Sequence, residues 1–324
     1  MQIHSLDKLN KSIKNYQYIL IDAKVLSIYT EKLPALKDKI VIEISEPEKR
    51  KNLNDFEQVV DKLLVSKIKR SDKLLVIGGG ATSDLGGFVA STIFRGIEWD
   101  VVPTTLLSMI DASIGGKVGI NTKRGKNLIG AFHLPSSISI VPDFLETLEK
   151  RDYLSGLGEL VKYIFLNPRD FYLEENLSRK SLDELILRSA QFKNQIVKID
   201  FKEKGIRECL NFGHTFGHAI EANSELSHGE AVYYGIFLNL TLFTPNFLER
   251  FLEIEKRLGL KREKLNMNFK SFLDSLSFDK KNEYENQIAI IIATENGVKP
   301  KEHFPIDEII ERLEKSDVYG YYFK

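Results

Sequence analysis

The chain has 324 residues and a mass of 37.1 kDa, which is enough for two domains with cores of their own. Lys and Arg together number 46, and so do Asp and Glu, so the net charge of +0 argues against nucleic acid or an anionic membrane as the main partner. The one cysteine, Cys209, excludes a disulfide within the chain, and as a lone thiol it is more typical of a small core residue than of a nucleophile. The N-terminal residues lack the apolar core of a signal peptide, and the most apolar later run, residues 231–244, is too short to cross a bilayer. We therefore expect a cytoplasmic protein.

The first half of the chain alternates between short apolar runs and helical patterns. The apolar runs predict strands at residues 18–21, 39–44, 73–77 and 99–102. A charged turn at residues 45–53 leads into a helix with apolar positions as far as Leu64, and Asp84 opens a second helix that extends to about Phe94. This alternation predicts an α/β domain with a parallel, Rossmann-like sheet and helices on both of its faces.

Three consecutive glycines, Gly78 to Gly80, follow the third predicted strand and precede a helix. Glycine lets the backbone approach a pyrophosphate, and a helix N-terminus favours negative charge, so this turn is a candidate phosphate site. The run GGGATSD departs from the GxGxxG fingerprint, so a plain tight turn is the alternative. Asp22, at the end of the first predicted strand, is a candidate partner for a ribose hydroxyl.

Residues 103–130 are dense in small and polar side chains next to apolar ones. Lys117, Lys126 and Asn127 lie beside glycines, which is the pattern expected of a cradle for an anionic ligand. A polar surface hairpin is the alternative interpretation.

The second half of the chain changes to long helical periodicity. We predict helices at residues 181–197, 210–222, 230–243 and 248–258, followed by a returning strand or buried segment at 288–293. Glu159, Lys162 and Tyr163 lie on neighbouring helical turns and are expected to face one site. We place the domain boundary near Lys150, with an α/β domain at residues 1–150 and a mainly helical domain at 151–324, and the cleft between them is the default place for a site.

Three of the six histidines lie close together in residues 210–232. His214 and His218 are four residues apart and therefore share a helix face, and His228 follows a short polar turn. Neutral imidazole is a common zinc ligand, and three ligands with one open position form the usual catalytic arrangement. Spacing alone would select His214 and His218 as the ligand pair, and ordinary surface or hydrogen-bonded core histidines are the alternative.

Several runs in a fixed order resemble the sugar-phosphate cyclases of the 3-dehydroquinate synthase family, from about residue 22 to residue 281. They are GGGATSDLGGF, RGIEWDVVPTTLLSMIDASIGGKVGINTKRGKNLIGAFHLP, SGLGELVKY, GIRECLNFGHTFGHAIE and HGEAV. The resemblance implies an N-terminal NAD-binding domain, a C-terminal helical domain that binds metal and substrate, and a homodimer. It also implies Zn²⁺ or Co²⁺ held by Glu159, His214 and His228, which leaves His218 for the substrate.

The resemblance implies roles for further residues. NAD would be bound by Asp22, Glu48, Lys51, Gly79, Gly80, Asp84, Thr104, Thr105, Lys117, Lys126 and Thr147. The catalytic residues would be Lys162, His218, Asp111 and Asn211. The substrate would be bound by Arg95, Lys117, Asn127, Lys193, Arg207 and Lys280, and Arg95 is expected to reach the site of the partner subunit.

The implied reaction converts 3-deoxy-D-arabino-heptulosonate 7-phosphate, a small sugar phosphate, into 3-dehydroquinate and phosphate in the shikimate pathway. NAD is transiently reduced, phosphate leaves by elimination, the hydride returns, the ring opens, and an aldol closure forms the carbocycle. The alternatives are another sugar-phosphate cyclase of the aminocyclitol-precursor type, a metal-dependent polyol-phosphate dehydrogenase, and a non-catalytic binding protein. Lys193 and Arg207 favour an acidic substrate, because buried cations need a carboxylate partner. The competing interpretation puts Lys193 on a solvated helix face and pairs Arg207 with Glu203 or Glu208.

Overall fold

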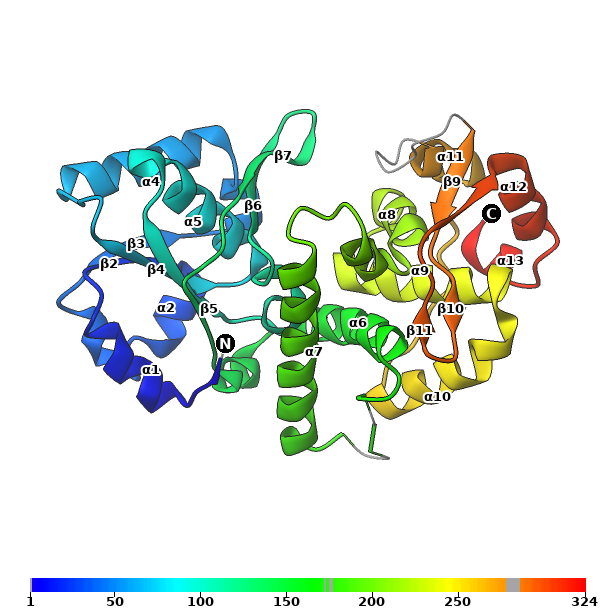
Figure 1. The fold of residues 1–324 in the computed structure, drawn as a ribbon, viewed down its shortest axis with the longest axis horizontal. Helices are drawn as coiled ribbons and strands as arrows, with labels where there is room; N and C mark the ends of the chain where they lie inside the picture. The colour runs from blue at the N-terminus through cyan, green and yellow to red at the C-terminus, as the bar shows by residue number, and fades with distance from the viewer. Residues whose placement is uncertain (1, 172, 175–176, 278–285) are drawn as a thin grey trace. The chain divides into compact units, whose positions relative to one another are not determined.

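The computed structural model describes residues 2–171, 173–174, 177–277 and 286–324 (Figure 1). The chain divides into two compact units. The first unit contains residues 1–149 together with 190–194, and the second contains residues 150–189 and 195–324. Lys280, a predicted substrate residue, lies outside the described residues.

A six-stranded sheet forms the centre of the first unit, and every pairing in it is parallel. In spatial order its strands are β1 (Gln2–Ile3), β8 (Ser137–Ile140), β5 (Glu98–Pro103), β4 (Lys73–Gly78), β2 (Tyr18–Asp22) and β3 (Ile40–Ile44). The four predicted strands are confirmed as β2 to β5, and so is the parallel α/β fold of this half. The edge strand β1 was not predicted, because two residues are too few to show a periodic pattern.

Helices cover both faces of this sheet. They are α1 (Leu6–Ile13), α2 (Ala23–Tyr29), α3 (Pro47–Arg50), α4 (Leu53–Val65) and α5 (Gly80–Thr92). In Figure 1, α4 and α5 lie on one side of the central strands, and α1 and α2 lie on the other. The prediction that the second helix begins at Asp84 is wrong, because α5 begins at Gly80 with Gly79 as its N-cap. The strand therefore passes directly into the helix through the glycines, and Asp84 lies in the second turn.

An antiparallel hairpin follows β5 in the chain. Its strands are β6 (Lys117–Thr122) and β7 (Gly125–Phe132), and a single π-helical turn, Ser108–Ala112, precedes it. The hairpin that was the alternative interpretation of residues 103–130 is therefore present. The candidate cradle residue Lys117 begins β6, and Lys126 and Asn127 lie in β7.

The second unit is mainly helical, as predicted. Its helices are α6 (Lys150–Leu166), α7 (Arg179–Ile199), α8 (His214–Ala222), α9 (His228–Phe243), α10 (Leu248–Leu258), α11 (Phe269–Ser277), α12 (Ile306–Glu314) and α13 (Tyr319–Tyr322). Residues 190–194 of α7 belong to the first unit. Two small antiparallel pairs complete it: β9 (Gln287–Ile290) with β12 (Glu302–Pro305), and β10 (Ala293–Thr294) with β11 (Gly297–Val298). Among the described residues, no helix is long and apolar enough to cross a membrane.

Two helix starts in this unit differ from the prediction. α8 begins at His214 and not at residue 210, because Gly213 takes the left-handed conformation (φ 76°) and separates α8 from a preceding 3₁₀ turn, Ile206–Asn211. α9 begins at His228, two residues earlier than predicted, because Ser227 and Glu230 form a capping box. As a result, His214 and His228 are each the first residue of a helix.

Gly229 marks the closest approach between α6 and α9. A Cβ atom at this position would lie 1.8 Å from the backbone oxygen of Ser155, and the Gly229 amide donates to the Ser155 hydroxyl oxygen at 3.1 Å. Any side chain on Gly229 would therefore force the two helices apart.

We expect Gly229→Ala to lower the free energy of unfolding by about 1–3 kcal/mol or more, because the overlap is with backbone that moves only with its helix. Denaturant unfolding would measure this loss. Gly320→Ala is the control, because a Cβ there meets nothing within 4 Å among the described atoms and should stabilise α13 by about 0.4–1 kcal/mol. Equal stability of the two variants would contradict the packing argument.

Candidate active site

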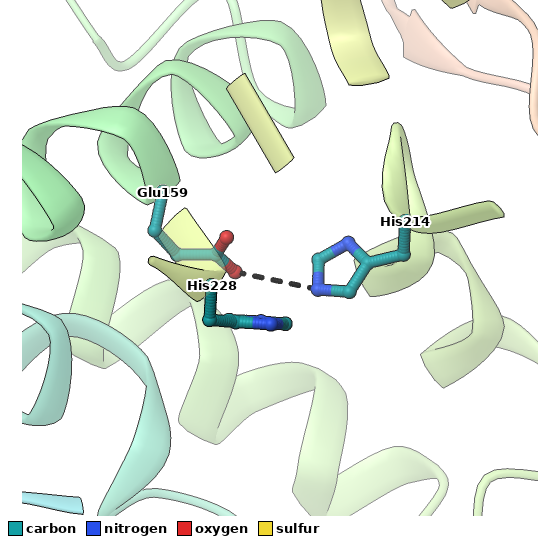
Figure 2. A group of neighbouring side chains, drawn as sticks. All are labelled: Glu159, His214 and His228. Carbon is teal, nitrogen blue, oxygen red and sulfur yellow. Dashed lines mark ion pairs between the residues drawn. The ribbon is translucent and has the colours of Figure 1, made fainter. Parts of the chain in front are cut away.

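Glu159, His214 and His228 form one group in the second unit (Figure 2). Their potential ligand atoms all lie within 4.8 Å of one another. Glu159 comes from the middle of α6, and the two histidines are the first residues of α8 and α9. Figure 2 shows the Glu159 carboxylate pointing toward the His214 ring, with its Oε1 atom 3.8 Å from Nε2.

Hydrogen bonds orient both imidazole rings in this group. The Nδ1 atom of His214 lies 3.2 Å from the backbone oxygen of Phe212, and that of His228 lies 2.9 Å from Oε2 of Glu221. A carbonyl and a carboxylate only accept hydrogen bonds, so Nδ1 is the donor in each ring. In the neutral imidazole this leaves the lone pair on Nε2, which is the arrangement found in histidines that bind metals.

The Glu159 carboxylate is fully buried, with 0% of the residue exposed. Its Oε1 atom pairs with the ammonium group of Lys162, and its Oε2 atom has no hydrogen-bond partner among the described residues. A buried acceptor without a partner is unfavourable by roughly 1–3 kcal/mol or more for a charged group, and a divalent cation would remove that penalty. Two imidazole nitrogens and one carboxylate oxygen match the three protein ligands of catalytic zinc sites, so these residues fit a metal ion.

His218 lies beside this group but is not one of its three members. Its ring centroid is 5.4 Å from that of His214 and 5.9 Å from that of His228. The pairing of His214 with His218 that spacing alone suggests is therefore not the group that the structure forms. His228, which lies on a different helix, takes that place.

Three of the predicted cationic and amide residues of the second unit are paired with acidic side chains. Lys162 is 1% exposed, and its ammonium group lies 4.8 Å from the centre of the Tyr163 ring. Arg207 is buried and has Nε 4.0 Å from Oε2 of Glu203, and Nδ2 of Asn211 donates to Oε1 of the same glutamate at 2.9 Å. The competing interpretation for Arg207, a pairing with Glu203, is thus what the structure contains.

Cys209 lies between these residues in the sequence. Burial raises the pKa of its thiol to about 11, which Lys162 only partly opposes. A thiol with this pKa is protonated at neutral pH, in agreement with a structural and not a nucleophilic role.

In the first unit, three of the predicted residues line one pocket of about 370 Å³: Asp84, Lys117 and Asn127. Lys51 is buried and pairs with Asp84 at 2.7 Å. Burial raises the pKa of Asp84, and the charge of Lys51 opposes that rise. This wall of the pocket therefore holds a paired carboxylate.

Lys193 and Asp111 also form a pair in the first unit. The ammonium group of Lys193 lies 2.7 Å from Oδ2 of Asp111 and 2.9 Å from its backbone oxygen, and Lys193 is buried. The alternative that Lys193 lies on a solvated helix face is wrong. Since Lys193 and Arg207 both have acidic partners, the argument that an unpaired cation requires a substrate carboxylate loses its physical basis.

The remaining predicted residues have varied settings. Asp22 caps α2 by accepting from the amide of Lys24 at 2.8 Å, and burial raises its pKa. Thr104 is buried, Thr105 bonds to Ser108, and the hydroxyl of Thr147 lies 2.9 Å from that of Tyr29.

Arg95 is exposed and has a left-handed backbone conformation (φ 66°). Glu48 accepts from Asn121 at 2.7 Å, and Lys126 is exposed.

Two residues that contact this machinery were not predicted from the sequence. Glu221 orients His228, and Asn121 bonds to Glu48. Neither belongs to a recognisable spacing pattern, although Glu221 lies one helical turn after His218 and so shares a face with it.

The chain is similar to known proteins over most of its length. The protein-family model described as 3-dehydroquinate synthase N-terminal matches residues 41–155, and the protein-family model described as 3-dehydroquinate synthase C-terminal matches residues 156–282. A 3-dehydroquinate synthase from Helicobacter pylori (strain G27) is 36% identical over 301 residues, covering 90% of this chain and 88% of that protein. One from Clostridium tetani is 35% identical over 340 residues, covering 96% and 90%.

Two solved structures are similar over nearly the whole chain. One is 2-epi-5-epi-valiolone synthase from Streptomyces hygroscopicus with NAD⁺ and Zn²⁺ bound, at a TM-score of 0.80, 26% identity, and coverage of 97% of this chain and 95% of that one. The other is 2-deoxy-scyllo-inosose synthase complexed with carbaglucose-6-phosphate, NAD⁺ and Co²⁺, at a TM-score of 0.82, 23% identity, and coverage of 95% and 94%. These likenesses show a common fold. The two matched halves and the curated relatives show that the chain belongs to the 3-dehydroquinate synthase family, whose members are carbon–oxygen lyases.

Proposed function

We propose that the protein converts 3-deoxy-D-arabino-heptulosonate 7-phosphate into 3-dehydroquinate and phosphate, as a cytoplasmic homodimer. The observation that carries the proposal is the group of Glu159, His214 and His228 beside the buried ammonium of Lys162. A cyclase of this kind must stabilise the negative charge that forms when a substrate hydroxyl loses its proton. A metal ion held by this group, together with the ammonium of Lys162, would provide that stabilisation.

Glu159, His214 and His228 would hold a divalent metal, Zn²⁺ or Co²⁺. The fit rests on the two oriented imidazoles and the unsatisfied carboxylate oxygen, and the two similar solved structures contain Zn²⁺ and Co²⁺. When bound, the metal would act as a Lewis acid that lowers the pKa of a substrate hydroxyl.

NAD would bind in the first unit, where α5 begins at Gly80, directly after β4. When bound, NAD would accept a hydride and return it, so there would be no net oxidation. The backbone amide groups at the start of α5 would donate to the pyrophosphate, and the paired side chains of Lys51 and Asp84 would form part of the binding site. The other proposed NAD residues are Asp22, Glu48, Gly79, Thr104, Thr105, Lys117, Lys126 and Thr147.

The chain's own residues would handle protons and anions. His218, whose ring lies beside the metal group, is placed to take a proton from a substrate hydroxyl and to return it. The ammonium group of Lys162 would stabilise a developing oxyanion, and Asn211 and Asp111 are proposed to orient the substrate. Anionic groups of the substrate would be bound by Arg95, Lys117, Asn127, Lys193, Arg207 and Lys280.

The test is a single incubation with the heptulosonate phosphate, NAD and zinc, in which phosphate and dehydroquinate are measured together. We expect equal amounts of both products and no accumulation of NADH, because NAD is recycled. Stoichiometric NADH would favour the polyol-phosphate dehydrogenase. Phosphate release without dehydroquinate, or turnover only with another sugar phosphate, would favour a different cyclase.

We expect Glu221→Ala to weaken metal binding by roughly 10–100-fold, because His228 loses the carboxylate that fixes its ring and its proton. Competition with a chelator of known affinity would measure this change. Glu225→Ala is the matched control, since Glu225 is exposed in the turn between the same two helices. The Glu225→Ala protein should bind metal with the same affinity as the unaltered protein. Equal affinities in both variants would show that Glu221 does not position His228.

A further inference from the structure

Asn121, on β6, connects two segments to which the proposed function gives different ligands. Its backbone amide donates to the backbone oxygen of Lys51 at 2.6 Å, and its side-chain Nδ2 donates to Oε1 of Glu48 at 2.7 Å. Its side-chain Oδ1 accepts the backbone amide of Asn127 at 3.0 Å. One carboxamide therefore holds the 48–51 segment and the β7 strand at the same time.

These bonds belong to a chain of contacts between two residues, Asp84 and Asn127, that line the pocket of about 370 Å³. From Asp84 the chain of contacts runs through its ion pair with Lys51, then through the Lys51 backbone oxygen to Asn121, and finally from Oδ1 of Asn121 to Asn127. Asn121 therefore links the two walls of the pocket.

Asn127 is exposed and lines the pocket, and its backbone has φ 55°, a left-handed conformation that asparagine adopts more readily than most residues other than glycine. The bond from its amide holds the backbone at this residue against the Asn121 side chain on β6.

We propose that Asn121 is a positioning residue that couples the binding of NAD to the binding of the phosphate group of the substrate. The inference rests on the proposed function, which assigns NAD to Glu48, Lys51 and Asp84 and an anion to Lys117 and Asn127. A ligand that orders one wall of the pocket orders the other through Asn121, so the second ligand loses less conformational freedom when it binds. Asparagine suits this position because its carboxamide donates to a carboxylate and accepts from an amide simultaneously.

The experiment is calorimetric titration of the full chain with NAD, in the absence and presence of saturating inorganic phosphate. In the unaltered protein, phosphate should tighten NAD binding by about fivefold or more, and NAD should tighten phosphate binding by the same factor. In Asn121→Ala the factor should fall to about one. Asn54→Ala is the matched control, because Asn54 is exposed on α4 and takes no part in the chain of contacts from Asp84 to Asn127. This variant should keep the same coupling factor as the unaltered protein.

A reversal of the hydrogen bond separates coupling from a general loss of structure. Asn121→Asp keeps the acceptor for Asn127 but sets a second carboxylate against Glu48. The repulsion should push the 48–51 segment, which includes Lys51, away from β6, so the coupling should be weakened. Combining it with Glu48→Gln should restore the coupling, because the new amide donates to the new carboxylate, whereas Glu48→Gln alone should not increase it.

The outcomes distinguish the inference from the function on which it rests. An unaltered protein that binds no NAD would overturn the proposed function. NAD binding without coupling to phosphate, or full coupling retained in Asn121→Ala, would overturn the role of Asn121 and leave the proposed function intact.

Discussion

His218→Ala is expected to keep a full complement of bound metal while turnover falls by roughly 10²–10⁴-fold. The three atoms that would hold the metal belong to Glu159, His214 and His228, and the imidazole of His218 lies beside them. Its removal takes away a group that moves a proton and leaves the metal ligands in place. Metal content by atomic emission and steady-state kinetics would measure the two effects separately.

His228→Ala is the matched variant, because both histidines are partly exposed and both changes remove one imidazole. It should purify with little metal, and its turnover should fall by on the order of a thousandfold or more, since the Lewis acid supplies several kcal/mol of stabilisation. Circular dichroism of both variants checks that they fold. A His218→Ala protein without metal would show that His218, and not His228, belongs to the ligand set.

Lys162→Met is expected to destabilise the metal-free protein by about 3–5 kcal/mol, because it leaves the Glu159 carboxylate buried without its cation. Both side chains of this pair are only 1% exposed, so solvent does not take over the role of the lysine. A bound divalent cation would neutralise the same carboxylate. The metal-loaded variant should therefore lose much less stability, and its affinity for metal should rise because a neighbouring positive charge is gone.

Thermal melting of chelator-treated and zinc-loaded protein would measure this difference. The increase in melting temperature on adding zinc should be larger in Lys162→Met than in the unaltered protein. Lys315→Met is the control: its pair with Glu311 is 73% and 62% exposed, so both the stability and the zinc effect should stay the same. An identical zinc effect in Lys162→Met and the unaltered protein would place the metal away from Glu159.

The regular elements of this protein follow closely from its sequence. Residues 248–258 were predicted as a helix and form α10, and four apolar runs form β2 to β5. Hydrophobic periodicity predicts such elements because each must bury one side against the core. Helix starts were less predictable: α5 and α8 begin where the glycines Gly79 and Gly213 take the cap positions, which periodicity does not register.

The family, and with it the expected ligand set, could also be recognised from the sequence. Several runs in one order are far more specific than a single spacing, and they pointed to Glu159, His214 and His228. The order of residues along the chain gave no physical reason for that choice over His214 and His218, because spacing on one helix reports only which residues share a face of that helix.

Tertiary packing decided which side chains meet. The close contact of α6 and α9 at Gly229 brings Glu159 near His228, and only the folded chain places Glu221 against that imidazole and Asn121 against Glu48. Packing also pairs Lys193 with Asp111 and Arg207 with Glu203. The argument that these two cations need a carboxylate from the substrate therefore no longer holds. A sequence determines which groups carry charge, but whether a buried charge has a partner depends on distances between elements that are remote in the chain.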